Sequence, residues 1–193
     1  MGHFSQRQPP FYFFILGKRS FMNVNPLTPA QANLELTLLN AEAESVASSD
    51  FFIWLSESGL PHEVAIRLKN LVDIVERNGN RIISIGKIIL IKIMEFVKVH
   101  PNLAIGIAVG AAIGALIFMV PFLGSYLAPT AILLGVSIGA IAGHRLDKIE
   151  QEHAVNTNMD PIAIGQDVIE IAKEFFKLLI DIFNTVFDTQ VFK

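Results

Sequence analysis

Cysteine is absent from this 193-residue chain. Its absence excludes disulfide bonds, thiolate catalysis and zinc sites built on cysteine. An excess of basic residues is also missing, because 15 lysines and arginines stand against 18 aspartates and glutamates. With a net charge of −3, the chain has no overall positive field to attract nucleic acid, and we expect no nucleic-acid partner.

Charged residues and histidine are missing from a long internal segment, which runs from Pro101 to Gly143. Over the whole chain 52% of residues are hydrophobic, a high fraction for a soluble protein. Residues 103–120 and 126–143 would each rise about 27 Å as a helix, enough to cross the hydrocarbon core of a bilayer. The sequence therefore predicts an all-α membrane protein in which residues 101–143 form a two-span transmembrane helical hairpin.

Basic residues flank both ends of the uncharged segment and are missing from its central turn. They are Lys87, Lys92 and Lys98 before the segment, and Arg145 and Lys148 after it. Lysine and arginine collect on the cytoplasmic side of membrane proteins, so we expect both termini in the cytoplasm and these five residues at the lipid interface. The expected location is the bacterial inner membrane, with membrane lipid as a partner.

Glycine recurs at every fourth position in both halves of the segment. A helix face built from glycine lets a second helix approach closely, which favours association inside a membrane. The two series are Gly106, Gly110 and Gly114, and Gly135, Gly139 and Gly143. An antiparallel arrangement places them at matching depths, either within one hairpin or between two subunits. The second arrangement predicts a homo-oligomer and allows a pore without charged lining residues.

Two regions precede the basic residues. Residues 1–27 are expected to form a flexible N-terminal extension. Its apolar run at residues 11–16 is too short for a signal peptide, and Met22 is an alternative start. Residues 28–80 are predicted to form a cytosolic helical region that begins at Thr28 and Pro29, a capping residue followed by a first-turn proline.

The segments next to the hairpin are predicted to be amphipathic helices. Residues 81–99 have a narrow, mostly basic stripe on an apolar helix, which indicates a helix in the membrane interface or, alternatively, one buried against its neighbours. After a linker at residues 144–160, residues 161–193 are predicted to form a C-terminal amphipathic helix with an acidic face. Such a face favours protein contact over anionic lipid, either with residues 61–75 or between subunits, and a protein partner could bind there. Its expected apolar stripe is Ile164, Val168, Ile171, Phe175, Leu178 and Ile182. No pattern predicts a β-strand.

The residues Val99-His100-Pro101-Asn102, followed by Ile105 and the first glycine series, carry a resemblance to known proteins. This stretch resembles the anchor of small ribosome-associated inner-membrane proteins of enteric bacteria, and glycine-zipper membrane proteins generally. The likeness covers residues 99–116. In that family the anchor looks like a single C-terminal span that ends in basic residues, whereas this chain adds a second glycine series and a long acidic helix. The resemblance implies a membrane anchor with glycine-mediated helix packing.

No residues stand at catalytic or metal-binding spacing in the sequence. The five histidines have neither metal-ligand spacing nor a paired catalytic acid. Residues 135–139 match the Gly-x-Ser-x-Gly pattern of a hydrolase nucleophile elbow, but no predicted strand precedes them, so Ser137 is interpreted as a helix-packing hydroxyl. We therefore expect no enzyme activity, no cofactor and no metal.

Three functional hypotheses follow from these expectations. The first is a small self-associating membrane protein that perturbs or permeabilises the membrane as an oligomer, as a pore or channel-like assembly. The second is a membrane-anchored adaptor or scaffold whose cytosolic helices recruit a partner. The third is a hairpin that curves the membrane.

Overall fold

The computed structural model describes residues 27–135 and 161–187, with side chains from residue 167 onward in the second range. Its elements, in chain order, are α1 (Pro29–Ser45), α2 (Ser48–Glu57), α3 (His62–Leu71), β1 (Glu76–Asn78), β2 (Arg81–Ile83), α4 (Ile85–Val99), α5 (Ile105–Met119), the 3-10 turn η1 (Pro121–Leu123) and α7 (Pro161–Phe187). A further helical segment covers residues 124–135. The predicted linker and most of the predicted N-terminal extension lie outside the described residues.

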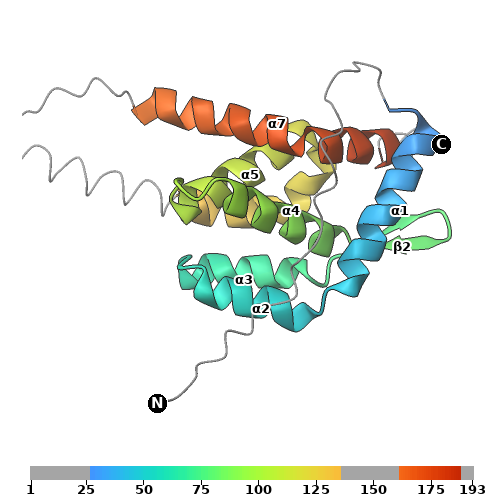
Figure 1. Cartoon of the computed structure of the whole chain (residues 1–193), viewed down its shortest axis with the longest axis horizontal. Coiled ribbons are helices and arrows are strands. Elements are labelled where there is room, and N and C mark those ends of the chain that lie inside the picture. Colours follow the sequence, from blue (N-terminus) through green and yellow to red (C-terminus); the bar gives the residue numbers. More distant parts are fainter. Residues whose placement is uncertain (1–26, 136–160, 188–193) are drawn as a thin grey trace, which may run out of the picture.

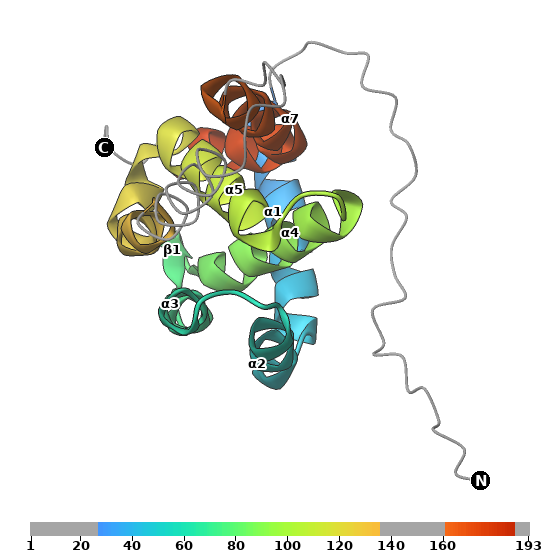
Figure 2. The same cartoon turned by 90° about the vertical axis from the view of Figure 1, so that its left-hand side faces the viewer.

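The helices form layers around α4 and α5. In Figure 1, α7 lies on one side of these two helices and α2 and α3 lie on the other, while α1 crosses one end of the assembly. Figure 2 shows the same arrangement from the side, with α5 between α7 and the layer of α2 and α3. The contacts agree with these views, because α5 packs on α7 and α4, and α1 packs on α7 and α4.

No helix among the described residues is both long enough and apolar enough to cross a membrane. α5 has only 15 residues, a rise of about 22 Å, and a 3-10 turn follows it at Pro121. The predicted two-span transmembrane hairpin is therefore wrong. The glycine-zipper and pore interpretations and the integral location in the bacterial inner membrane depended on that hairpin and are not supported either. Residues 136–143 of the second predicted span lie outside the described part of the chain.

The uncharged helix α5 is a core helix. Its buried residues are Ala108, Val109, Ala111, Ala112, Ile113, Ala115 and Leu116. Four of these are alanines, whose small side chains let neighbouring helices come close. Because α5 is packed by both α7 and α4, a charged side chain on its buried faces would have no water and no partner. The lack of charge on these buried faces therefore reflects burial in protein, whereas Ile107, Phe118 and Met119 of the same helix are exposed.

The apolar stripe of α7 is rotated from the predicted one. Val168 and Ile182 are buried as expected, but Ile171 and Leu178 are 43% and 50% exposed. The side chain of Ile164 lies outside the described residues. The observed stripe is Val168, Ala172, Phe176, Leu179, Phe183 and Val186. Phe96 of α4 contacts this helix, with ring centroids 5.2 Å from Phe175 and 5.6 Å from Phe176.

A β-hairpin joins α3 to α4, and the expectation of no strand was wrong. β1 and β2 pair antiparallel, with Glu76 opposite Ile83 and Asn78 opposite Arg81. Gly79 has a φ of 62° in the turn, a left-handed conformation that glycine adopts without steric cost. The two-residue loop is Gly79-Asn80, and a loop of this kind with glycine first is typical of tight hairpin turns. This local signal outweighs the helical spacing of the residues that follow.

The predicted interfacial helix 81–99 is consequently shorter and buried. Residues 81–83 belong to β2, and the helix begins at Ile85. Ile88, Ile89, Leu90 and Ile93 of α4 are at most 1% exposed, so the helix is covered on several sides. Burial against neighbouring helices, the alternative interpretation of this segment, is the observed one.

Gly86 lies where the start of α4 touches the end of α3. A Cβ atom at this position would lie 1.5 Å from the carbonyl oxygen of Leu71 and 2.6 Å from its carbonyl carbon. The backbone N–H of Gly86 also donates to the carbonyl of Ile74 at 3.1 Å. Only glycine fits this contact, because the opposing atoms are backbone.

We expect Gly86→Ala to lower the free energy of unfolding by about 3 kcal/mol, since the two backbones would have to separate. Urea unfolding followed by circular dichroism measures the change. Gly106→Ala is the matched control, because a Cβ there meets no heavy atom within 4 Å. In a helix this control is expected to be neutral or to gain about 0.5–1 kcal/mol. Equal stability of the two variants would contradict the close contact.

Candidate functional site

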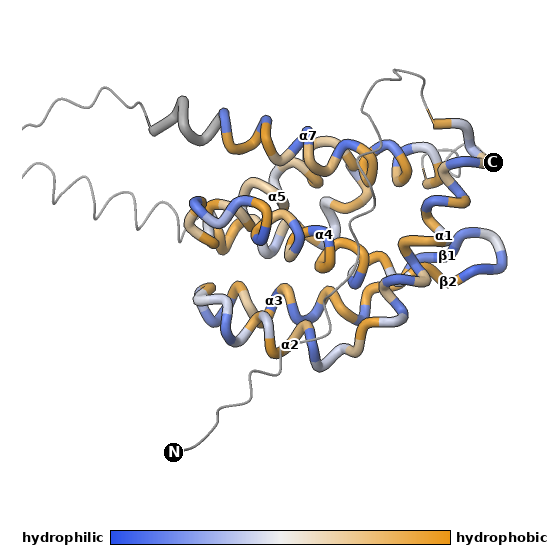
Figure 3. Tube along the Cα trace, viewed as in Figure 1, coloured by the Kyte–Doolittle hydropathy of each residue, from blue (hydrophilic) through white to orange (hydrophobic). Residues whose placement is uncertain are grey.

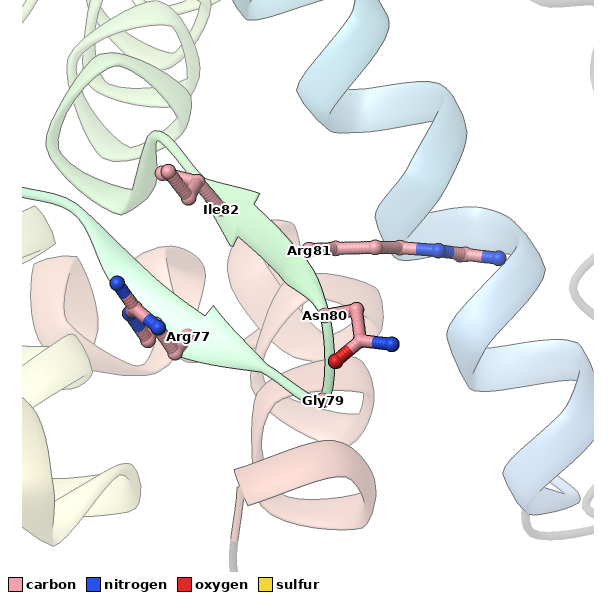
Figure 4. A pocket seen from close by; sticks show the side chains of 5 residues that line it. All are labelled: Arg77, Gly79, Asn80, Arg81 and Ile82. Carbon is pink, nitrogen blue, oxygen red and sulfur yellow. The ribbon is translucent and has the colours of Figure 1, made fainter.

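The described residues contain no group of three or more potential metal ligands. A shallow hollow of about 110 Å³ lies at the β-hairpin, lined by Arg77, Gly79, Asn80, Arg81 and Ile82 (Figure 4). The strand register places Arg77 beside Ile82 on one face and Arg81 beside Asn78 on the other. Figure 4 shows the two arginine side chains pointing apart, with Arg81 reaching toward α1. They do not converge on a substrate or anion.

Arg81 and its hairpin are held by a polar stripe on α1. Four polar residues of that helix, spaced four, three and four apart, share one face, and we call them the α1 polar stripe: Asn33, Thr37, Asn40 and Glu44. At the outer end of the stripe, Asn78 Nδ2 donates to Asn33 Oδ1 at 2.8 Å. Arg81 Nη1 donates to Thr37 Oγ1 at 2.7 Å.

The inner half of the stripe binds the junction between β2 and α4. Asn40 Oδ1 accepts a 2.7 Å hydrogen bond from the backbone N–H of Ser84, and Asn40 Nδ2 donates to the carbonyl of Ile82 at 3.4 Å. Ser84 is only 7% exposed, and its hydroxyl donates to Glu44. Lys87 Nζ lies 4.0 Å from the same carboxylate. The polar stripe therefore faces protein and satisfies buried groups.

This orientation leaves an apolar stripe of α1 exposed to solvent. Leu34 and Leu38 are 60% and 56% exposed, and Ala30 and Ala41 are exposed beside them; we call these four residues the outer face of α1. They lie roughly opposite the buried Ala32, Leu36 and Ala43. Figure 3 shows hydrophobic and hydrophilic residues alternating along α1. The helix is thus apolar on two sides. Its third, polar side binds the β-hairpin and Ser84.

The charged residues of α1 itself have one sign, although Arg81 of β2 donates to Thr37 and Lys87 of α4 lies 4.0 Å from Glu44. α1 carries Glu35, Glu42 and Glu44, and the sequence has no lysine or arginine between residues 20 and 66. Two exposed aromatic residues elsewhere in the protein have a lysine above the ring. Lys69 Nζ lies 4.6 Å from the Phe52 ring centroid, and Lys173 Nζ lies 5.1 Å from that of Phe118. The leucines of α1 have acidic neighbours along the helix instead. The surface suits a ligand that brings both apolar and basic groups.

Three of the six glycines singled out in the sequence have open space beside them. A Cβ atom at Gly106, Gly114 or Gly135 would meet no heavy atom within 4 Å. Gly110 is partly exposed on α5. Gly139 and Gly143 lie outside the described residues. The three glycines with open space are therefore not points of close helix approach within the described part of the chain.

The predicted interfacial lysines lie near carboxylates. Lys92 Nζ is 2.8 Å from Glu95, and the side chains of Lys87 and Lys92 are 16% and 22% exposed. Lys98 ends α4. Arg145 and Lys148 lie outside the described residues. The sequence did not predict the exposed outer face of α1, although polar residues spaced four, three and four apart in 33–44 indicated a polar stripe on this helix.

Comparison with protein-family models, curated proteins and solved structures finds no match to this chain. The outer face of α1 is therefore interpreted from its own residues.

The opposite side of the hairpin is tied to the segment 124–135. The Tyr126 hydroxyl donates to a carboxylate oxygen of Glu76 in β1. This hydrogen bond, burial and the negative charge of Glu76 raise the pKa of Tyr126 above its ordinary value of 10.0. The hairpin is thus fixed on one side by α1 and on the other by Tyr126.

We expect Asn40→Ala to lower the free energy of unfolding by about 1–3 kcal/mol, because the buried N–H of Ser84 would lose its acceptor. Chemical unfolding measures the loss, and amide exchange at Ser84 should accelerate. Asn70→Ala, at an exposed position on α3, is the control and should change stability by less than about 0.5 kcal/mol. An Asn40→Ala variant as stable as this control would show that the bond to Ser84 contributes nothing.

We expect Glu76→Gln to lower the pKa of Tyr126 toward 10, since the acceptor loses its charge. Ultraviolet absorbance measures phenolate formation in the chain, which has two tyrosines. The pKa of Tyr126 is higher in the folded state than in the unfolded state, so the Glu76 contact stabilises the fold at pH values below the unfolded pKa of this tyrosine. That stabilisation is lost as the pH rises through the raised pKa of the folded state. Glu63→Gln is the control. Superimposable titration curves for all three proteins would rule out the Glu76 contact as the cause.

Proposed function

We propose that this protein is a helical interaction module whose outer face of α1 binds a short segment of a partner protein. The partner segment carries apolar side chains flanked by lysine or arginine. The observation that supports this proposal is the orientation of α1. Its polar stripe makes hydrogen bonds to the rest of the protein, whereas Leu34 and Leu38 are exposed to solvent.

The energetic basis is burial of two leucines. Each is a little over half exposed, and full burial of a leucine stabilises a complex by about 1.5–3 kcal/mol, so the pair supplies about 2–3 kcal/mol on binding. Glu35 and Glu42 add attraction for a basic ligand and speed its association. A carboxylate-rich partner would be repelled by the same residues.

The size of the surface favours a segment over a folded partner. α1 has 17 residues and is about 25 Å long, and one helix face about 10 Å wide offers about 250 Å². A stable interface between folded proteins needs about 800 Å² from each partner. A peptide-like helix laid along α1 matches the available area, in the manner of helix recognition by i and i+4 anchors.

This proposal keeps the partner-recruiting part of the adaptor hypothesis and omits its membrane anchor. The pore and membrane-curving hypotheses required two membrane-spanning helices, and we do not propose them. Contact of a partner with the 161–193 helix is a weaker candidate, because α7 already packs on α5 and α1. Self-association through the same surface is less favoured, since two copies of α1 would bring their glutamates together.

The probe for this function is a labelled amphipathic peptide of about 15 residues, with leucine on one face and lysine on the other, long enough to form a helix. We expect the full chain to bind it and Leu34→Asp/Leu38→Asp to bind at least about tenfold more weakly, a difference of about 1.4 kcal/mol in fluorescence anisotropy. A peptide with glutamate in place of lysine should not bind.

Ile132→Asp is the matched control, because Ile132 is 67% exposed on the segment 124–135, away from α1. It should bind the lysine peptide like the unmodified chain. Undiminished binding by the Leu34→Asp/Leu38→Asp protein, or equal binding of the glutamate peptide, would remove the proposal.

A further inference from the structure

The chain itself contains a segment with the chemistry that the outer face of α1 selects. Residues 11–16 read Phe-Tyr-Phe-Phe-Ile-Leu, and Lys18 and Arg19 follow after Gly17. The sequence has no acidic residue before Glu35. A continuous apolar run with a basic pair at its end is the kind of ligand argued above for an apolar face with acidic neighbours.

We propose that residues 11–19 bind the outer face of α1 of the same chain and compete there with the partner. This inference rests on the proposed function, because it assigns a regulator to the same surface. The aromatic and aliphatic side chains cover Leu34 and Leu38, and the basic pair lies toward the glutamates of α1. The surface is then covered until a partner segment displaces the chain's own.

Charge complementarity supports this occupant over other parts of the molecule. Residues 1–34 carry Arg7, Lys18 and Arg19 and no acid, while α1 carries Glu35 and Glu42 and no base. The third glutamate of α1, Glu44, accepts from Ser84 and lies 4.0 Å from Lys87, so it is already engaged within the protein. α7 is a poor occupant, since its exposed residues include Asp167, Glu170, Glu174 and Asp181. A second acidic segment on α1 would meet repulsion.

The length of the connection permits the contact. The described chain begins at Leu27, immediately before α1, and Leu34 lies seven residues further, about 10 Å along the helix. The ten residues from 17 to 26 reach about 33 Å when extended, three times the distance needed. A tether of this length holds the segment at a millimolar effective concentration near the face, so a weak contact is well occupied.

The absence of cysteine makes a direct distance measurement possible. Spin labels are attached to Gln8→Cys and Ser45→Cys. The first label precedes residues 11–19, and the second marks the C-terminal end of α1. In full chains diluted with unlabelled protein, electron paramagnetic resonance should show a narrow short-distance population. The same labels in a Phe13→Asp/Ile15→Asp chain should give the broad distribution of a segment that is tethered but not bound.

The matched control is Ser5→Asp/Gln6→Asp, which adds the same two charges outside the apolar run and should keep the narrow population. A broad distribution in the undiluted and diluted full chain would overturn the inference. A short distance that appears only when two singly labelled chains are mixed would also overturn it, because the segment would then bind a second copy.

Binding of the lysine peptide separates this inference from the proposed function. If the segment occupies the face about nine-tenths of the time, Phe13→Asp/Ile15→Asp should bind the peptide about tenfold more tightly than the full chain. Equal affinity with a broad label distribution refutes the internal ligand and leaves the docking function in place. Failure of both proteins to bind the peptide refutes the proposed function, and with it any competition at this surface.

Discussion

The hydrogen bond from the backbone of Ser84 to Asn40 fixes the arrangement on which the rest of the surface depends. The donor lies at the junction of β2 and α4, where it is buried and outside regular strand pairing, so it needs a partner from elsewhere in the chain. Asn40 supplies it, and this sets the rotation of α1 about its own axis. With its polar stripe committed to the hairpin, α1 can bury only one of its two apolar stripes, and the other faces water.

Buried polar groups need hydrogen-bond partners, and this requirement also explains why the buried faces of α5 carry no charge. α5 has small and aliphatic residues on nearly every side, a composition shared by membrane spans and fully buried helices. Length separates the two, since α5 stops after 15 residues at a 3-10 turn. Asn184 Nδ2 of α7 donates to the carbonyl of Met119 at 2.9 Å, which satisfies a backbone group at this helix end within the protein.

Part of this structure was predictable from sequence. The helical class and the start of α1 follow from composition and from Thr28 and Pro29, and Thr28 indeed forms a capping box with Gln31. The hairpin was missed because β1 and β2 have three residues each, too few for a strand periodicity, although Gly79-Asn80 marked the turn. The outer face of α1 was missed because a helix with apolar residues on two sides has no single stripe, and only the location of Ser84 shows which side is used.

The contacts of the α1 polar stripe have a consequence for the order in which the chain can fold. They join residues 40 to 45 positions apart in the sequence, from Asn33–Asn78 to Glu44–Ser84. Because a chain is made from its N-terminus, α1 is synthesised before the hairpin that its polar stripe binds in the folded protein. The contact that distinguishes the buried apolar side of α1 from the exposed one is therefore available only after residue 84 has been added.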